Sequence, residues 1–396
     1  TCKNEVPMNA AEIPKEQVPN PGIAYTKRVR GAAEIQVFLC FLGIAAYGYF
    51  GLRQWSALAT SLSKNLFVQV VSGWIPVWAT CALCSILHSC YMFYVDRKFG
   101  LSRSSMPSRI LESLKANAFA FAYTAAIIVV VFASNQAPSS YGWLWASTFA
   151  TLLFLSTTAT LPWVLSRFYP LTPLLDTSLR ERLTRLADKA SLQLGTIYEW
   201  HISGRTRQAN ALVSGVGAAR RILLTDTLMS ELSEDEVEAI VAHEFGHCAL
   251  RHIWKRTLLK FLIFCGVFFV IGSLVGTDLI WFADKNEGWK DAKLVPGIFF
   301  YWTIFNIYGN IIMAALARRQ EKAADLYSWK LMGRTQPFIT AMKKLSALNL
   351  ITFDKSTQWK YMHPPTPDRI AAAEEYEKQH FGFVEESQAA TQHSGT

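Results

Sequence analysis

"VEAIVAHEFGHCALRH", residues 237–252, places a glutamate and two histidines in a run that otherwise has the apolar spacing of a buried helix. On a helix, His243 and His247 are one turn apart and share a face, so their imidazoles can converge on one metal ion. Glu244 would then reach a water molecule on that ion. The stretch therefore predicts a helix with a metal-binding HExxH motif. Two hydrogen-bonded structural histidines in a buried helix are the alternative.

A third metal ligand is expected elsewhere in the chain, because a catalytic zinc has three protein ligands and one open position. The stretch "ARRQEKAADLYSWKLMG" (317–333) directly follows an apolar segment and contains Glu321, with Asp325 one helical turn later. Glu321 suits the third ligand, and Asp325 suits a carboxylate that orients a ligating histidine. A surface helix with charges four residues apart is the alternative. Together with HExxH, this pattern favours one Zn²⁺ per chain.

Two signals place the HExxH helix after a small sheet. Ser233 in "LSEDE" is followed three residues later by Glu236, which forms a capping box that opens a helix. Upstream, three β-type runs are separated by turns with glycine and arginine. These runs are "TIYEWHIS" (196–203), "ANALVSG" (209–215) and "RILLTDTL" (221–228). We therefore expect a small antiparallel sheet directly before the motif.

The composition is that of a membrane protein. Of the 396 residues, 51% are hydrophobic and only 17% are charged, which is more apolar than an ordinary soluble domain. Six apolar stretches each approach the ~20 residues that a helix needs to cross a bilayer core. They cover roughly residues 35–52, 67–95, 116–134, 143–165, 258–283 and 295–316. We expect a membrane helix at each of them.

Lysine and arginine alternate in density between these stretches, and this alternation predicts the topology. By the positive-inside rule both termini, the 96–115 loop and residues 166–257 and 317–396 face the cytoplasm. The net charge of +9 has the same explanation. No basic stripe with interleaved aromatic residues and no nucleic-acid motif occurs, so no nucleic-acid partner is expected. The lipid bilayer is the expected partner.

The membrane stretches divide the chain into six expected parts. The expected parts are a flexible N-terminal tail (1–34), four transmembrane helices (35–165), a cytoplasmic part with the HExxH helix (166–257), a transmembrane hairpin (258–316), a second cytoplasmic part with the third ligand (317–385) and a disordered tail (386–396).

Four motifs occur in a fixed order along most of the chain. They are "RKFGLSR" (97–103), "NALVSGVGAARRILLTDTL" (210–228), "HEFGH" (243–247), and "RRQEKAAD" (318–325) followed by "HPPTPDRI" (363–370). In these motifs and their order, the sequence resembles the integral-membrane zinc metallopeptidases that include the type I CAAX prenyl proteases and the bacterial heat-shock membrane protease. The prenyl-protease branch usually has seven spans, which implies that one span is missing before the first one here.

The resemblance implies a mainly α fold. It implies a polytopic α-helical membrane protein with a gluzincin-like zinc-protease domain that contains a small antiparallel β-sheet. The helices would form a bowl around a chamber, with the metal site facing inward. Position by position, the resemblance implies that His243, His247 and Glu321 are the zinc ligands and that Glu244 is the general base.

The resemblance also implies roles for residues around the metal. It implies that His363 donates a hydrogen bond to the negatively charged intermediate and that Asn210 holds the substrate backbone at an edge strand. Arg318 and Arg369 would brace the site through ion pairs, with ordinary surface arginines as the alternative. Asp325 would orient a ligand, and a proton-donor role for it stays open.

The implied activity is that of a membrane-embedded zinc endopeptidase. Zinc would activate a water molecule, Glu244 would take its proton, and the hydroxide would attack a peptide carbonyl. The substrate would be a peptide or protein, and a prenylated C-terminal tail is one candidate. A quality-control metalloprotease for membrane proteins is an alternative. So is a non-catalytic zinc-binding membrane scaffold, although that function gives Glu244 no role.

The implied location is an integral multi-pass membrane protein with its active site toward the cytoplasm. The membrane would be the inner membrane if the source is bacterial and the endoplasmic reticulum membrane if it is eukaryotic. Two residues beyond the motif are expected outside the metal site. Helical rotation takes His252 off the ligand face. Cys248 is expected to be a packing residue, because a fourth ligand would close the position that water needs.

Overall fold

The structure is a computed structural model. It describes residues 21–136, 141–215, 220–275, 288–350 and 361–381, together with residues 277, 279 and 286. In chain order the elements are α1 (Pro21–Ala46), a π-helical turn η1 (Tyr47–Gly51), α2 (Leu52–Leu62), α3 (Leu66–Lys98), α4 (Met106–Gln136), α5 (Gly142–Phe168), β1 (Leu171–Pro173), α6 (Thr177–Lys189), β2 (Ile197–Trp200), β3 (Ala211–Ser214), β4 (Arg221–Thr225), α7 (Asp226–Glu231), α8 (Glu234–Ala249), α9 (His252–Leu274), a 3₁₀ turn η3 (Gly288–Lys290), α10 (Leu294–Met332), α11 (Gln336–Asn349) and α12 (Thr366–His380).

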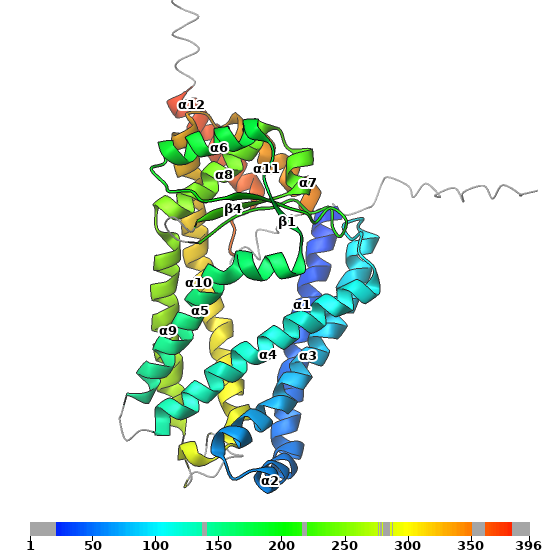
Figure 1. Ribbon diagram of the computed structural model, residues 1–396, viewed down its shortest axis with the longest axis vertical. Coiled ribbons are helices and arrows are strands. Elements are labelled where there is room, and N and C mark those ends of the chain that lie inside the picture. The colour runs from blue at the N-terminus through cyan, green and yellow to red at the C-terminus, as the bar shows by residue number, and fades with distance from the viewer. Residues whose placement is uncertain are drawn as a thin grey trace, which may run out of the picture.

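Long apolar helices make up one end of the molecule (Figure 1). Among the described residues, five helical stretches are long and apolar enough to cross a membrane, namely Pro21–Leu62, Leu66–Lys98, Met106–Gln136, His252–Leu274 and Leu294–Met332. The remaining expected stretch, 143–165, lies within the 27-residue helix α5. The expected span 258–283 runs past the end of α9, and residues 276, 278 and 280–283 lie outside the described residues. Side chains such as Phe38, Leu62 and Leu258 are more than half exposed on these helices, as lipid-facing residues would be.

The prediction that residues 1–34 form a flexible tail is wrong for residues 21–34, which form the start of α1. A contact with the C-terminal end of α3 holds this segment in place. The Tyr25 hydroxyl donates a hydrogen bond to Asp96 Oδ1 at 2.9 Å. The Tyr25 ring also meets Phe99 edge-on at 5.4 Å. Residues 1–20 and 386–396 lie outside the described residues.

The predicted antiparallel sheet is a mixed sheet in the structure. All three predicted runs form strands, and β1 is added at one edge, which gives the order β1-β2-β4-β3. β2 and β4 are parallel, whereas the β1–β2 and β3–β4 pairs are antiparallel. The segment between β2 and β3 explains the difference, because it bridges to the α3–α4 loop through Ser102 and Thr206 instead of turning back as a hairpin. β4 therefore enters between β2 and β3, and β3 is left at a sheet edge.

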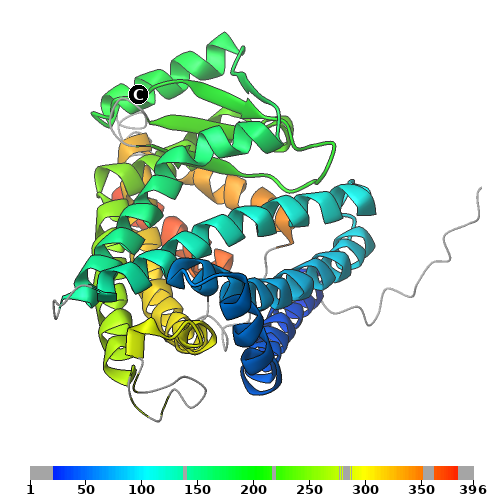
Figure 2. The same cartoon turned by 60° about the horizontal axis from the view of Figure 1, so that its bottom comes forward.

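Helices α6, α8, α11 and α12 gather beside the sheet at the end of the molecule opposite α2 (Figures 1 and 2). The predicted capping box of α8 is confirmed. The Ser233 side chain accepts from the Glu236 backbone N–H, and the Glu236 carboxylate accepts from the Ser233 backbone N–H at 2.8 Å. The same carboxylate lies 2.7 Å from Lys344 Nζ of α11. Val241 and Phe245 of α8 are fully buried in the core that α8 shares with α6, α11 and the sheet.

The Asp226 carboxylate fastens the sheet to the loop after β2, and this contact predicts an acid-sensitive step. It accepts hydrogen bonds from the backbone N–H groups of Ile202, Ser203 and Thr227 at 2.9–3.0 Å. Burial by itself raises the pKa of Asp226, but the hydrogen bonds from Ser203 and these amides outweigh burial and lower it. A lowered pKa in the folded state stabilises the fold above the unfolded-state pKa of about 3.9. This stabilisation is lost as the pH falls through the folded-state value.

We expect Asp226→Ala to reduce the free energy of unfolding by about 1–3 kcal/mol at neutral pH, because several donors lose a charged acceptor. The variant should also lose less stability than the parent when the pH is lowered below about 4. Unfolding in detergent micelles, followed at several pH values, measures both effects. Glu181→Gln is the control, because the Glu181 side chain is 68% exposed. Equal acid sensitivity of parent and Asp226→Ala would contradict this role.

Candidate metal centre

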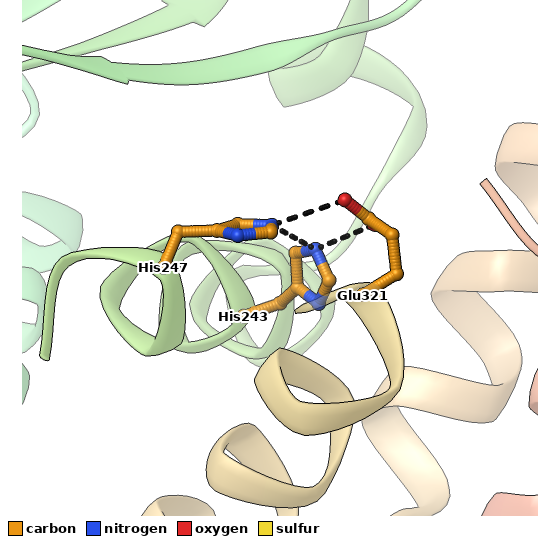
Figure 3. A group of neighbouring side chains, drawn as sticks. All are labelled: His243, His247 and Glu321. Carbon is orange, nitrogen blue, oxygen red and sulfur yellow. Dashed lines mark hydrogen bonds and ion pairs between the residues drawn. The ribbon is translucent and has the colours of Figure 1, made fainter. Parts of the chain in front are cut away.

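His243, His247 and Glu321 converge at one point, as Figure 3 shows. Each offers one ligand atom, and these atoms lie within 4.8 Å of one another. The Nε2 atoms of the two histidines are 3.2 Å apart. Glu321 Oε2 lies 3.4 Å from His243 Nε2, and Glu321 Oε1 lies 3.3 Å from His247 Nε2. The structure thus brings together the two histidines of α8 and the predicted carboxylate of α10.

The 39-residue helix α10 carries the third residue of this group to α8. It begins as an apolar stretch and continues without a break to Glu321 and Asp325. The two helices approach closely at Gly246, where an added Cβ would lie 2.9 Å from the Ala324 Cα atom and 3.0 Å from its carbonyl oxygen. Glycine at this position lets the imidazoles and the carboxylate reach one another.

Asp325 lies behind His243 and is itself held by an arginine. Asp325 Oδ1 is 2.8 Å from His243 Nδ1. Arg369 of α12 donates to both oxygens of the same carboxylate, at 2.8 Å and 2.5 Å. Burial alone would raise the pKa of Asp325, but the charge of Arg369 and the hydrogen bond with His243 lower it. Asp325 is therefore an anion that accepts the Nδ1 proton of His243 and leaves Nε2 free for a metal.

The chemistry of the three central side chains fits a transition-metal ion. Glu321 is only 2% exposed, and its carboxylate oxygens face imidazole nitrogens of His243, His247 and His363 at 2.8–3.4 Å. A buried carboxylate is costly unless a cation or hydrogen-bond donors compensate its charge. Two imidazoles and one carboxylate are a known donor set for catalytic zinc, and three protein ligands leave one position open. His243 and His247 would hold such an ion together with Glu321.

Glu244 lies beside this group on α8 and is partly exposed. Its carboxylate makes no hydrogen bond or ion pair with another residue of the described ranges. Burial lowers the pKa of Arg369, but the Asp325 carboxylate outweighs burial and raises it, and the charge of Glu244 adds a smaller contribution. The role of Glu244 as general base stays a prediction.

The structure also gives contacts for three other predicted residues. His363 lies before α12 with its side chain 61% exposed, and its Nδ1 atom is 2.8 Å from Glu321 Oε2. Arg318 donates to the Tyr361 carbonyl at 2.8 Å and so fastens the segment that carries His363. Asn210 is exposed at the start of the edge strand β3, and its backbone N–H donates to Thr225 Oγ1 at 2.9 Å. The catalytic roles of His363 and Asn210 stay predictions.

His252 lies off the metal-ligand face, as expected, but it contacts the ligand His247 at the nitrogen that points away from the site. Its Nδ1 atom is 2.8 Å from Nδ1 of His247, and the residue is 3% exposed. Helical rotation did not predict this contact, because α8 ends before His252. The one signal in the sequence was a third histidine five residues after the motif.

Comparison with known proteins gives the chain a family. A family model described as peptidase family M48 matches residues 173–377, which is more than half of the chain. The chain belongs to peptidase family M48. The matched region contains strands β2, β3 and β4, the histidines of α8, Glu321 and most of α12. Membership in this family confirms the resemblance that the four sequence motifs indicated.

The chain is also similar in sequence to a bacterial and to a yeast protein. An uncharacterised metalloprotease of Bacillus subtilis is 28% identical over 242 residues, which are 60% of this chain and 56% of that protein. CAAX prenyl protease 1 of Saccharomyces cerevisiae is 25% identical over 300 residues, which are 71% of this chain and 66% of that protein. The chain thus spans less than two thirds of the length of these two relatives.

The fold is similar to that of a protein whose crystal structure is known. The crystal structure of S. mikatae Ste24p matches with a TM-score of 0.70 at 22% sequence identity, over 81% of this chain and 79% of that one. This match and the long apolar helices confirm the predicted polytopic helical fold. The M48 protein described here is an integral, multi-pass membrane protein.

The close approach of α8 and α10 predicts that a methyl group added at Gly246 disturbs the metal site. Gly246→Ala adds a Cβ that collides with the Ala324 backbone, so the helices must separate and spread the three ligand atoms. We expect the variant to lose about 1–3 kcal/mol of stability and to retain less metal after dialysis. Metal per chain by mass spectrometry and the unfolding midpoint are the measurements.

Gly266→Ala in α9 is the matched control, because an added Cβ there meets open space. It should keep the metal content and the unfolding midpoint of the parent. If both alanine variants behave alike, close packing at Gly246 does not set the ligand geometry.

Proposed function

We propose that this chain is a membrane-embedded zinc endopeptidase. The observation that carries the proposal is the convergence of two imidazoles and one buried carboxylate within 4.8 Å, with Glu244 beside them. When bound, zinc polarises a peptide carbonyl and lowers the pKa of a coordinated water molecule to about 7. The family match supports this activity, since a peptidase is an enzyme that hydrolyses peptide bonds.

The residues of the chain divide the remaining work. Glu244 accepts the proton of the attacking water and passes it to the leaving amine. Asp325, held by Arg369, keeps the Nδ1 proton of His243 in place and thereby orients this ligand. His363 donates a hydrogen bond to the oxygen that becomes negatively charged during the attack.

The edge strand β3 is the proposed substrate platform. It lies at one side of the sheet, and it contacts α8. An extended peptide can add to such an edge through backbone hydrogen bonds. Asn210 at the start of β3 offers a side-chain amide that can donate to, and accept from, the same peptide backbone.

The proposed membrane orientation places this centre at the cytoplasmic side. The supporting observation is the density of lysine and arginine in the 96–115 loop and in the segments after residues 165 and 316. Protease added to sealed vesicles of known orientation would cut residues 166–257 only from the cytoplasmic side under this proposal.

Glu244→Gln tests the proposed mechanism, because it removes the general base and leaves the three ligands unchanged. We expect about one zinc ion per chain, as in the parent, and a loss of ~10²–10⁴-fold in turnover. Metal analysis and cleavage of a fluorogenic peptide are measured on the same sample. A variant that cleaves as fast as the parent would refute the role of Glu244. A parent that binds zinc but cleaves no peptide would favour a non-catalytic scaffold.

The substrate class is proposed to be C-terminal tails that carry a prenyl group, with misfolded membrane proteins as the alternative. The similarity to the CAAX prenyl protease 1 of Saccharomyces cerevisiae supports the first class. A prenylated peptide, the same peptide without the prenyl group and an unfolded membrane protein are offered to the purified enzyme. We expect a higher kcat/KM for the prenylated peptide. Equal rates for the two peptides would instead favour a quality-control protease.

A further inference from the structure

His252 stands against one of the proposed metal ligands, on the side away from the metal site. Its Nδ1 atom lies 2.8 Å from Nδ1 of His247, and the two ring centroids are 5.0 Å apart. The Nε2 atom of His247, at the opposite side of its ring, faces His243 and Glu321. The two nitrogens of His247 therefore have separate neighbours, one in the ligand cluster and one on His252.

A break between two helices creates this contact. On a continuous helix, His252 would be rotated by about 140° from His247, because successive residues turn by about 100°. Instead α8 ends at Ala249, and Arg251 adopts the left-handed conformation with φ 54°. The Arg251 N–H donates to the Cys248 carbonyl at 3.1 Å and closes this turn. The chain then enters α9 with His252 as its first residue, directed back at His247.

The hydrogen-bond chemistry of the pair permits one arrangement when a metal is present. His247 can bind an ion through Nε2 only if the lone pair on that atom is free, so its ring proton must be on Nδ1. A proton on Nδ1 of His247 needs an acceptor, and His252 Nδ1 is the atom at hydrogen-bonding distance. His252 must then accept through Nδ1 and carry its own proton on Nε2.

We propose that His252 is a positioning residue for the metal site, which fixes the tautomer and the ring orientation of His247 by accepting its Nδ1 proton. The inference rests on the proposed metal site and extends it to a residue outside the HExxH motif. It also gives a function to the strained turn at Arg251, which costs free energy that a continuous helix would not.

His243 and His247 thus have different supports, although both donate from Nδ1. His243 donates to the carboxylate of Asp325, whose charge is balanced by Arg369. His247 donates to an imidazole, which as an acceptor carries no charge. A carboxylate acceptor raises the basicity of a ligand histidine more than a neutral one does. Because His252 is neutral, no second carboxylate stands behind the ligands. The bound ion would then keep more of its positive charge, which favours polarisation of a carbonyl.

Three substitutions at residue 252 separate the hydrogen bond from packing. Asn places its amide oxygen near the position of the imidazole Nδ1 atom and can accept the proton, whereas Gln places its amide near the Nε2 position. Leu fills the space without an acceptor. The zinc dissociation constant is measured by competition with a chelator, and the absorption spectrum of the Co²⁺-substituted protein reports the ligand geometry. Thr257→Val is the control, because Thr257 is buried on the same helix and its hydroxyl has no partner among the described residues.

We expect His252→Leu and His252→Gln to weaken zinc binding by about 10–100-fold and to change the Co²⁺ spectrum. His252→Asn and Thr257→Val should stay near the parent in both measurements. If Leu fails to fold, the equally polar Asn and Gln variants decide the question between them. Equal zinc affinity of Asn and Gln, or parental affinity of Leu, would overturn the proposal. A parent that binds no zinc would instead overturn the proposed function itself.

Discussion

The burial of the Glu321 carboxylate between two imidazoles is the interaction on which the rest of the structure depends. A buried anion is unfavourable by several kcal/mol unless cations or donors surround it. Burial alone would raise the pKa of Glu321, but His243, His247 and His363 lower it in the folded protein. The carboxylate and the imidazoles stabilise one another only where α8 and α10 nearly touch, at Gly246 and Ala324. This close contact therefore sets both the stability and the geometry of the centre.

The path of the chain makes the metal centre dependent on the membrane part. Between the HExxH motif and Glu321, the chain leaves along α9 and returns along α10, two of the helices long enough to cross a bilayer (Figure 1). Because α10 is one helix from the apolar stretch to Asp325, a shift of its membrane half moves the third ligand. His252 stands at the first turn of α9 and gives that helix a contact with the centre as well.

Local patterns predicted most of the fold and the centre, and they failed where distant segments meet. The spacing of His243 and His247, the capping box at Ser233 and the continuation of α10 to Glu321 are all properties of single helices. The parallel pairing of β2 with β4 depends on a bridge to the α3–α4 loop about 100 positions earlier, which no local pattern contains. The contact of His252 with His247 depends on the left-handed backbone of Arg251. The spacing of apolar residues gives no sign of this conformation, because an arginine is equally compatible with a continuing helix.

X-ray absorption at the zinc edge tests the central claim most directly, because it reports the atoms bound to the ion in the intact membrane protein. The account predicts two imidazole nitrogens at about 2.0–2.1 Å and carboxylate or water oxygen at about 2.0–2.2 Å, with no sulfur. A sulfur scatterer at about 2.3 Å would mean that a cysteine such as Cys248 binds the ion. That result, or a spectrum with a single imidazole, would contradict a centre built from His243, His247 and Glu321.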